Sequence, residues 1–98
     1  MALTLCVLLW PHEGHEAELV AYEDRALPLV ADHGGRVLQR VRAAGADPSG
    51  AQPFEVHVIE FPSPTALDAY LADDRRAALA DHRDRAIART ELLPVDVV

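Results

Sequence analysis

His57 is the residue of this sequence whose type and position most readily suggest chemistry. It lies in a segment of alternating polarity, residues 54–61, which is typical of a β-strand. We expect one face of this strand to lie under helices and to consist of Phe54, Val56 and Val58. The opposite face would then carry Glu55, His57, Ile59 and Phe61. Since an imidazole changes charge near neutral pH, His57 is a candidate general base; structural pairing of His57 and Glu55 with neighbouring strand residues is the alternative.

Arginines and one carboxylate extend this candidate site. Arg36, Arg40 and Arg42 belong to a second predicted strand, residues 36–42, and we expect them in register on one face. Any of them could hold an anionic ligand or stabilise a developing oxyanion, and the arginine that faces His57 is left open. Glu60 lies amid apolar neighbours, so burial would raise its pKa unless it forms a salt bridge with an arginine on an adjacent strand. Arg36 could equally pair with helix carboxylates.

Two aromatic residues are candidate ligand contacts. Trp10 ends the first apolar segment, and Tyr22 belongs to the helix expected after it. Both could border a small-molecule pocket between sheet and helix, although packing in the core is the simpler interpretation.

No motif predicts a metal or a cofactor. His12 and His15 are three residues apart, not four as in the zinc-protease signature, and a solvated loop is the simpler interpretation. The single cysteine, Cys6, lies in an apolar strand and is expected to be an inert core residue. The chain also lacks a phosphate-binding loop, a dinucleotide fingerprint and a Ser-His-Asp arrangement.

The composition limits the class of protein. Ninety-eight residues make one domain, 1–98, and an apolar content of 50% excludes intrinsic disorder. The net charge of −7 argues against nucleic acid or an anionic membrane as a partner. Residues 3–10 are apolar but too few for a membrane helix, and no basic residue precedes them, so we expect a soluble, cytoplasmic protein.

Six elements are expected to position these residues. Residues 3–10 form a central strand, and a helix over residues 15–33 breaks near Ala26 because of Pro28. In that helix, residues 16, 18 and 23–25 are placed on the polar face. Residues 43–53 are rich in turn formers and form a hairpin loop. Ser63-Pro64 starts the second helix, and Asp73-Asp74 interrupts it. Residues 91–98 form the last strand, which must lie at an edge or contain a bulge because Pro94 has no N–H to donate.

The order strand, helix, strand, strand, helix, strand is that of the ferredoxin-like fold. It predicts an α+β domain with a four-stranded antiparallel sheet and two helices on one face. The other face, with Ile59 and Phe61, would be exposed and apolar, and such a surface usually marks an interface. We therefore expect a homodimer in which two sheets pack face to face.

Three segments carry a family resemblance: Ala31-Asp32-His33-Gly34-Gly35-Arg36-Val37-Leu38, then Val58-Ile59-Glu60-Phe61-Pro62-Ser63, and a helix with Leu67, Ala69 and Tyr70. With these segments the chain resembles the domain-of-unknown-function family 1330. That family belongs to the dimeric α/β-barrel superfamily, as does the antibiotic-biosynthesis monooxygenase type. The resemblance implies the fold and the dimer, and no established reaction.

Two hypotheses about function follow. The first is a homodimeric protein that binds a small organic ligand, between sheet and helices or inside the dimer barrel. The second is a cofactor-independent monooxygenase or isomerase with His57 as the catalytic base. A purely structural module would be favoured if the interior of the barrel were filled by side chains.

Overall fold

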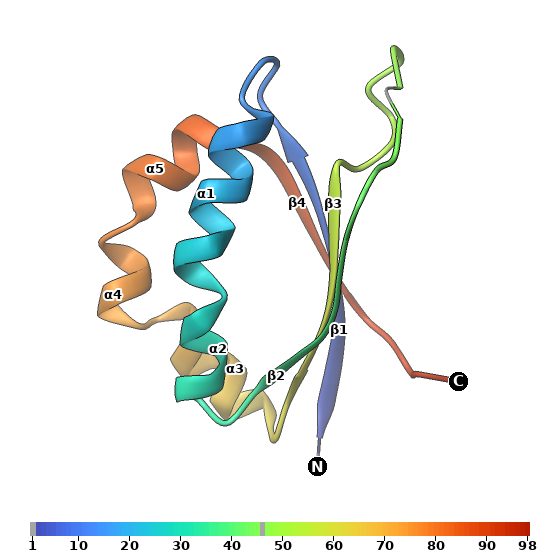
Figure 1. Cartoon of the computed structure of the whole chain (residues 1–98). Helices are drawn as coiled ribbons and strands as arrows, with labels where there is room; N and C mark the ends of the chain where they lie inside the picture. Colours follow the sequence, from blue (N-terminus) through green and yellow to red (C-terminus); the bar gives the residue numbers. More distant parts are fainter. Residues whose placement is uncertain (1, 46) are drawn as a thin grey trace.

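The computed structural model describes residues 2–45 and 47–98, so position 46 of the predicted loop 43–53 lies outside the described residues. The elements are β1 (Leu3–Pro11), α1 (Glu16–Ala26), α2 (Pro28–Asp32), β2 (Arg36–Arg42), β3 (Glu55–Phe61), α3 (Pro64–Leu71), α4 (Asp74–Ala77), α5 (Ala80–Ala86) and β4 (Ile87–Pro94). The strand order is β2-β3-β1-β4, and all neighbours are antiparallel. The helices cover one face of the sheet (Figure 1). This confirms the ferredoxin-like fold.

The first helical region breaks where the sequence predicts. Pro28 has no backbone donor, so α1 ends at Ala26 and α2 begins at Pro28 itself, where a missing N–H is harmless. Gly34 then adopts a φ of +76°, a conformation that ends the helix and suits glycine. A Cβ on Gly35 would lie 2.9 Å from the Glu60 carbonyl oxygen, so the chain can turn into β2 against β3 only with glycine here.

The second helical region also follows its sequence signals. The Ser63 hydroxyl accepts a hydrogen bond from the backbone N–H of Ala66, and Pro64 is the first residue of α3. The predicted interruption lies between α3 and α4, where the Asp73 carboxylate caps α4 by accepting from the N–H of Arg75.

The last strand begins earlier than predicted. The sequence predicts residues 91–98, whereas β4 runs from Ile87 to Pro94, because Ile87 is already extended and pairs with Pro11 of β1. We expected Ile87 to belong to the helix, since it continues an apolar helical spacing. Pro94 lies at the end of an edge strand, as its missing donor requires.

The two faces of β3 are the reverse of the prediction. Its residues at positions 55, 57, 59 and 61 are buried under the helices, and those at 56, 58 and 60 lie on the open face. Strict alternation gives two possible faces, and both sets contain apolar residues. The pairing with β1 selects between them, because Ile59 lies opposite the buried Leu5, whereas Val58 lies opposite the partly exposed Cys6. Ile59 and Phe61 are therefore core residues, not exposed ones.

The open face of the sheet is still apolar, although other residues form it. Cys6, Leu8, Val56 and Val58 lie at its centre and are partly exposed. Val41 on β2 and Leu93 on β4 flank them, with exposed fractions of 51% and 54%. β1 is central, as predicted, but within one chain only its helix-side face is covered.

No helix in the described part of the chain combines the length and the apolar character needed to cross a membrane.

Candidate functional site

A small pocket lies between the sheet and the helices. It has a volume of about 50 Å³, and its walls come from β1, α1, β3, α3 and β4. Most lining side chains are aliphatic or Phe. The exceptions are Glu23 from α1, His57 from β3 and Tyr70 from α3. A carboxyl, an imidazole and a phenol therefore share one largely apolar pocket.

Glu23 is a candidate site residue that the sequence analysis does not identify. Its residue type predicts a place on the polar face of the helix, yet its exposed fraction is only 6%. Among the described residues, no group forms a hydrogen bond with its carboxyl. Burial raises the pKa of Glu23, and the nearby His57 acts in the opposite direction. A signal was present, because Glu23 lies four residues after Leu19 and four before Leu27, both of which are buried.

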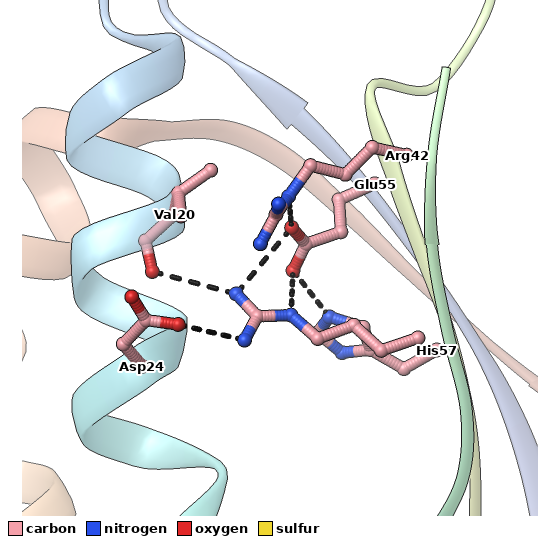
Figure 2. A network of polar contacts seen from close by, with 6 residues as sticks. Val20, Asp24, Arg42, Glu55 and His57 are labelled. Atoms are coloured by element: carbon pink, nitrogen blue, oxygen red, sulfur yellow. Dashed lines mark hydrogen bonds and ion pairs between the residues drawn. The ribbon is translucent and has the colours of Figure 1, made fainter. Parts of the chain in front are cut away.

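His57 is buried beside Glu55 on the same strand (Figure 2). Nε2 of His57 lies 2.5 Å from Oε2 of Glu55. Burial alone would raise the pKa of Glu55, but hydrogen bonds from His57, Arg42 and Arg40 outweigh it and lower this pKa to about 2. Glu55 is therefore a carboxylate at neutral pH, so Nε2 of His57 carries the proton of this hydrogen bond. The structure thus fixes both the orientation and the tautomer of the imidazole.

Two arginines complete the network around Glu55. Nε of Arg42 donates to Glu55 at 2.6 Å, and Nε of Arg40 donates to the other carboxylate oxygen at 3.0 Å. Arg40 also donates to Asp24 on α1 at 2.7 Å, so it links the sheet to the helix layer. Arg40 is the cross-strand neighbour of His57, which answers the question that the sequence left open. Neither arginine lines the pocket, and carboxylates hold both guanidiniums.

Arg36 lies on the other side of the sheet, contrary to the expected alignment of the three arginines. An irregularity between Val37 and Gln39 shifts the register of β2, so that Arg36 shares the open face with Glu60 while Arg40 and Arg42 share the helix side. Nη2 of Arg36 lies 3.0 Å from Oε1 of Glu60. The salt bridge to an adjacent strand is therefore confirmed, and neither residue reaches the pocket of His57.

The two aromatic candidates lie apart from each other. Tyr22 is 1% exposed and packs in the core with Leu9 and Leu19, as the simpler interpretation has it. Trp10 lines a separate cleft of about 720 Å³ between the β1–α1 and β2–β3 loops. The Arg89 guanidinium, on the neighbouring strand β4 and not among the residues that line this cleft, lies 4.5 Å from the centre of the indole ring. This cleft is larger than the pocket of Glu23 and His57, and neither of those two residues lines it.

Each of the two histidines near the start of α1 lies beside a polar group of the chain. Nε2 of His12 lies 3.0 Å from the carbonyl oxygen of Asp84, and His15 pairs with Glu18. Within residues 2–45 and 47–98, no group of three His, Cys, Asp or Glu side chains could hold a metal ion.

The pocket offers two titratable groups and apolar walls. His57 is held by Glu55, whereas the carboxyl of Glu23 is left for a ligand. This arrangement can orient one polar group of a small molecule, and it can accept or donate a proton there.

Comparisons with known proteins agree with the fold. A family profile described as "Domain of unknown function (DUF1330)" matches residues 12–98. The structure resembles that of a protein of unknown function from Rhodopseudomonas palustris, with a TM-score of 0.75, 16% identity, and coverage of 99% of this chain and 82% of that one. No curated protein matches the chain.

Two further solved structures bear on the assembly and the chemistry of relatives. One is a dimeric ferredoxin-like protein of unknown function from Jannaschia sp. CCS1, with a TM-score of 0.70, 15% identity, and coverage of 99% and 100%. The other is a candidate antibiotic biosynthesis monooxygenase from Bacteriodes thetaiotaomicron VPI-5482, with a TM-score of 0.75, 14% identity, and coverage of 99% and 90%. At these identities the likeness shows the fold alone.

Proposed function

Since this chain belongs to the DUF1330 family, whose description assigns no reaction, we propose from the geometry of its site that it binds a small organic molecule between sheet and helices. The observation that carries the proposal is the shared pocket of Glu23 and His57. Glu23 is only 6% exposed, and burial disfavours the charged form of its carboxyl, a cost that functional sites commonly carry.

The size of the pocket limits the part of the ligand that enters. A cavity of about 150 Å³ can bind benzene, so a volume of 50 Å³ accommodates about two carbon atoms. Pockets that enclose a whole drug-sized ligand have about 300–1,000 Å³, so this pocket takes one end of a molecule. Leu71 and Leu92 line it and are 39% and 50% exposed, which offers apolar contact to the remainder of the ligand.

Binding can be tested by nuclear magnetic resonance titration with small neutral probes such as isobutyramide. We expect saturable shifts at pocket residues, including His57 and Tyr70. Val7→Phe adds about four carbon atoms at the pocket wall, which is enough to fill it, and should abolish these shifts. Identical shifts in the wild type and in a folded Val7→Phe variant would refute binding at this site.

We also propose that two copies pack through their open sheet faces. The apolar surface of Leu8, Val56 and Val58 supports this, with Val41 and Leu93 beside them, because contiguous exposed apolar patches usually mark an interface. The dimeric relative of the same fold gives independent support.

Light scattering after size exclusion tests the dimer. We expect about twice the protomer mass of 10.7 kDa for the wild type and a shift toward 10.7 kDa for Leu93→Glu. Leu71→Glu is the matched control, because Leu71 is an exposed leucine on the helix side. A wild-type mass of 10.7 kDa at micromolar concentration would exclude the dimer.

A cofactor-independent enzyme is the second candidate function. Glu23 and His57 could move a proton from one carbon of a substrate to another, an isomerisation that needs no co-reactant. The assay is exchange of carbon-bound hydrogen of small ketones in D2O, with His57→Gln and Glu23→Gln as variants. Equal exchange rates in wild type and variants would exclude this chemistry. The monooxygenase alternative predicts substrate-dependent O2 consumption, measurable with an oxygen electrode.

A further inference from the structure

Arg76 on α4 is in an unusual state for an arginine beside a pocket. Its Nε is buried and has no hydrogen-bond partner in the described part of the chain. No carboxylate of the described residues lies within ion-pair distance of the guanidinium. Arg40, Arg42 and Arg75, by contrast, are each held by at least one carboxylate. A buried donor without a partner costs free energy, and it indicates that a group absent from the isolated chain completes it.

The position of Arg76 relates it to the pocket. Cζ of Arg76 lies 5.2 Å from the centre of the Tyr70 ring, and Tyr70 forms part of the pocket wall. Arg76 lowers the pKa of Tyr70 through a side-chain hydrogen bond and through its charge, and its charge lowers the pKa of Glu23, against the larger effect of burial on each. An arginine that contacts Tyr70 but has no carboxylate partner therefore lies near the same pocket as the largely buried carboxyl of Glu23.

We infer that Arg76 recognises an anionic ligand group, and that the ligand is a small aliphatic carboxylic acid. Its carboxylate would lie between Arg76 and Glu23, and its hydrocarbon end would enter the apolar pocket. This inference rests on the proposed binding function and specifies its ligand class. A guanidinium suits a carboxylate, because its planar N–H groups match the two oxygens. The volume of about 50 Å³ suits the two methyl groups at the end of a short branched chain.

Glu23 takes part only in its protonated form. A neutral carboxyl can donate a hydrogen bond to the ligand carboxylate, whereas an ionised one would repel it. The groups that act on Glu23 are His57 and Glu55 from β3, Arg40 from β2 and Arg76 from α4. Because burial raises the pKa of Glu23, binding of the carboxylate should weaken as the pH rises and Glu23 loses its proton.

The first experiment compares isobutyrate with isobutyramide, which has the same shape but no charge. Both are titrated into the full chain and followed by nuclear magnetic resonance at fixed ionic strength. Arg76→Gln should weaken isobutyrate binding by about tenfold or more and leave isobutyramide unchanged. Arg85→Gln removes the same charge from an exposed helix position and should change neither.

The outcomes separate the two proposals. If Arg76→Gln leaves the affinity for isobutyrate unchanged while both probes bind, the role of Arg76 is wrong and the pocket stands. If neither probe shifts pocket resonances in the wild type, both the pocket and its ligand class are overturned.

The second experiment isolates Glu23. Wild-type affinity for isobutyrate should fall as the pH rises and Glu23 loses its proton. Glu23→Gln should still bind isobutyrate, with a much weaker dependence on pH, because its amide stays neutral and retains N–H donors. A variant whose pH profile matches the wild type would overturn the role of Glu23, since a purely structural change would not alter that profile.

Discussion

Replacing Glu55 with glutamine keeps the volume of this side chain and removes its charge. In the folded protein the carboxylate is fully buried and accepts hydrogen bonds from His57, Arg40 and Arg42. The neutral amide of glutamine cannot compensate two guanidiniums, so we expect Glu55→Gln to destabilise the fold at neutral pH.

The size of this effect can be obtained in two ways. The pKa of Glu55 falls from 4.5 to about 2, and each unit of pKa corresponds to about 1.4 kcal/mol, which gives about 3 kcal/mol. Loss of one partner from a buried ion pair typically costs about 3–5 kcal/mol. The lower end applies here, because Arg40 and Arg42 are 24% and 43% exposed and water can solvate them partly. A loss of about 3 kcal/mol corresponds to a fall in Tm of roughly 15 °C for a chain of this length.

The dependence on pH gives the sharper test. The folded pKa of Glu55 lies below its ordinary value, so its stabilisation is complete above pH 4.5 and is lost as the pH falls toward 2. Urea unfolding is followed by circular dichroism at one fixed protein concentration. At pH 7 the free energy of unfolding of Glu55→Gln should therefore be about 3 kcal/mol lower than that of the wild type. This difference should shrink below pH 4.5.

Glu18→Gln is the matched control for Glu55→Gln. Glu18 forms surface ion pairs with His15 and Arg85 and is 44% exposed, so its loss should cost less than about 1 kcal/mol. The stabilising role of the Glu55 carboxylate would be refuted if Glu55→Gln lowered the free energy of unfolding no more than the control does. It would also be refuted if the loss stayed constant down to pH 2.

Three further substitutions test other parts of the structure. Glu23→Gln should stabilise the fold by about 1 kcal/mol at pH 7 in urea unfolding, and the gain should disappear at low pH, because burial raises the pKa of Glu23 and penalises its charged form. Gly35→Ala should lower the free energy of unfolding by about 2 kcal/mol in the same assay, because its Cβ would lie 2.9 Å from a backbone carbonyl oxygen. In the control Gly45→Ala the Cβ has no atom within 4 Å, so the free energy of unfolding should not fall. Ser63→Ala should cost about 1 kcal/mol by thermal unfolding through loss of the helix cap, and Thr65→Ala should cost less.

Local signals were sufficient for the elements and their order. Pro28 and Gly34 ended helices through backbone geometry, and Ser63 began one through its hydroxyl. These effects act within a few residues, so the sequence alone predicts them. The start of β4 was missed because Ile87 fits both the helical spacing and the strand, and only its pairing with Pro11 decides.

The candidate site was predicted in part. His57 and Arg40 were singled out by residue type, and the structure places both on the helix side of the sheet, as neighbours across two strands. Arg36 and Glu60 form an ion pair on the open face, and Trp10 lies in a separate cleft. Glu23 was assigned to the polar face because its residue type outweighed its spacing, and burial of a charged group depends on the layer packed above it.

The sequence by itself determined the order of the elements, the helix boundaries at Pro28, Gly34 and Ser63, and that the sheet has an apolar second face, because these follow from backbone geometry and from alternation along one strand. The tertiary structure decided which face of β3 the helices cover, since alternation is symmetric and only pairing with β1 breaks the symmetry. It also decided that Arg36 and Arg40 lie on opposite sides, because an irregularity in β2 shifts the register between them. The pocket of Glu23 and His57 exists only through these non-local contacts, which join residues 34 positions apart in the chain.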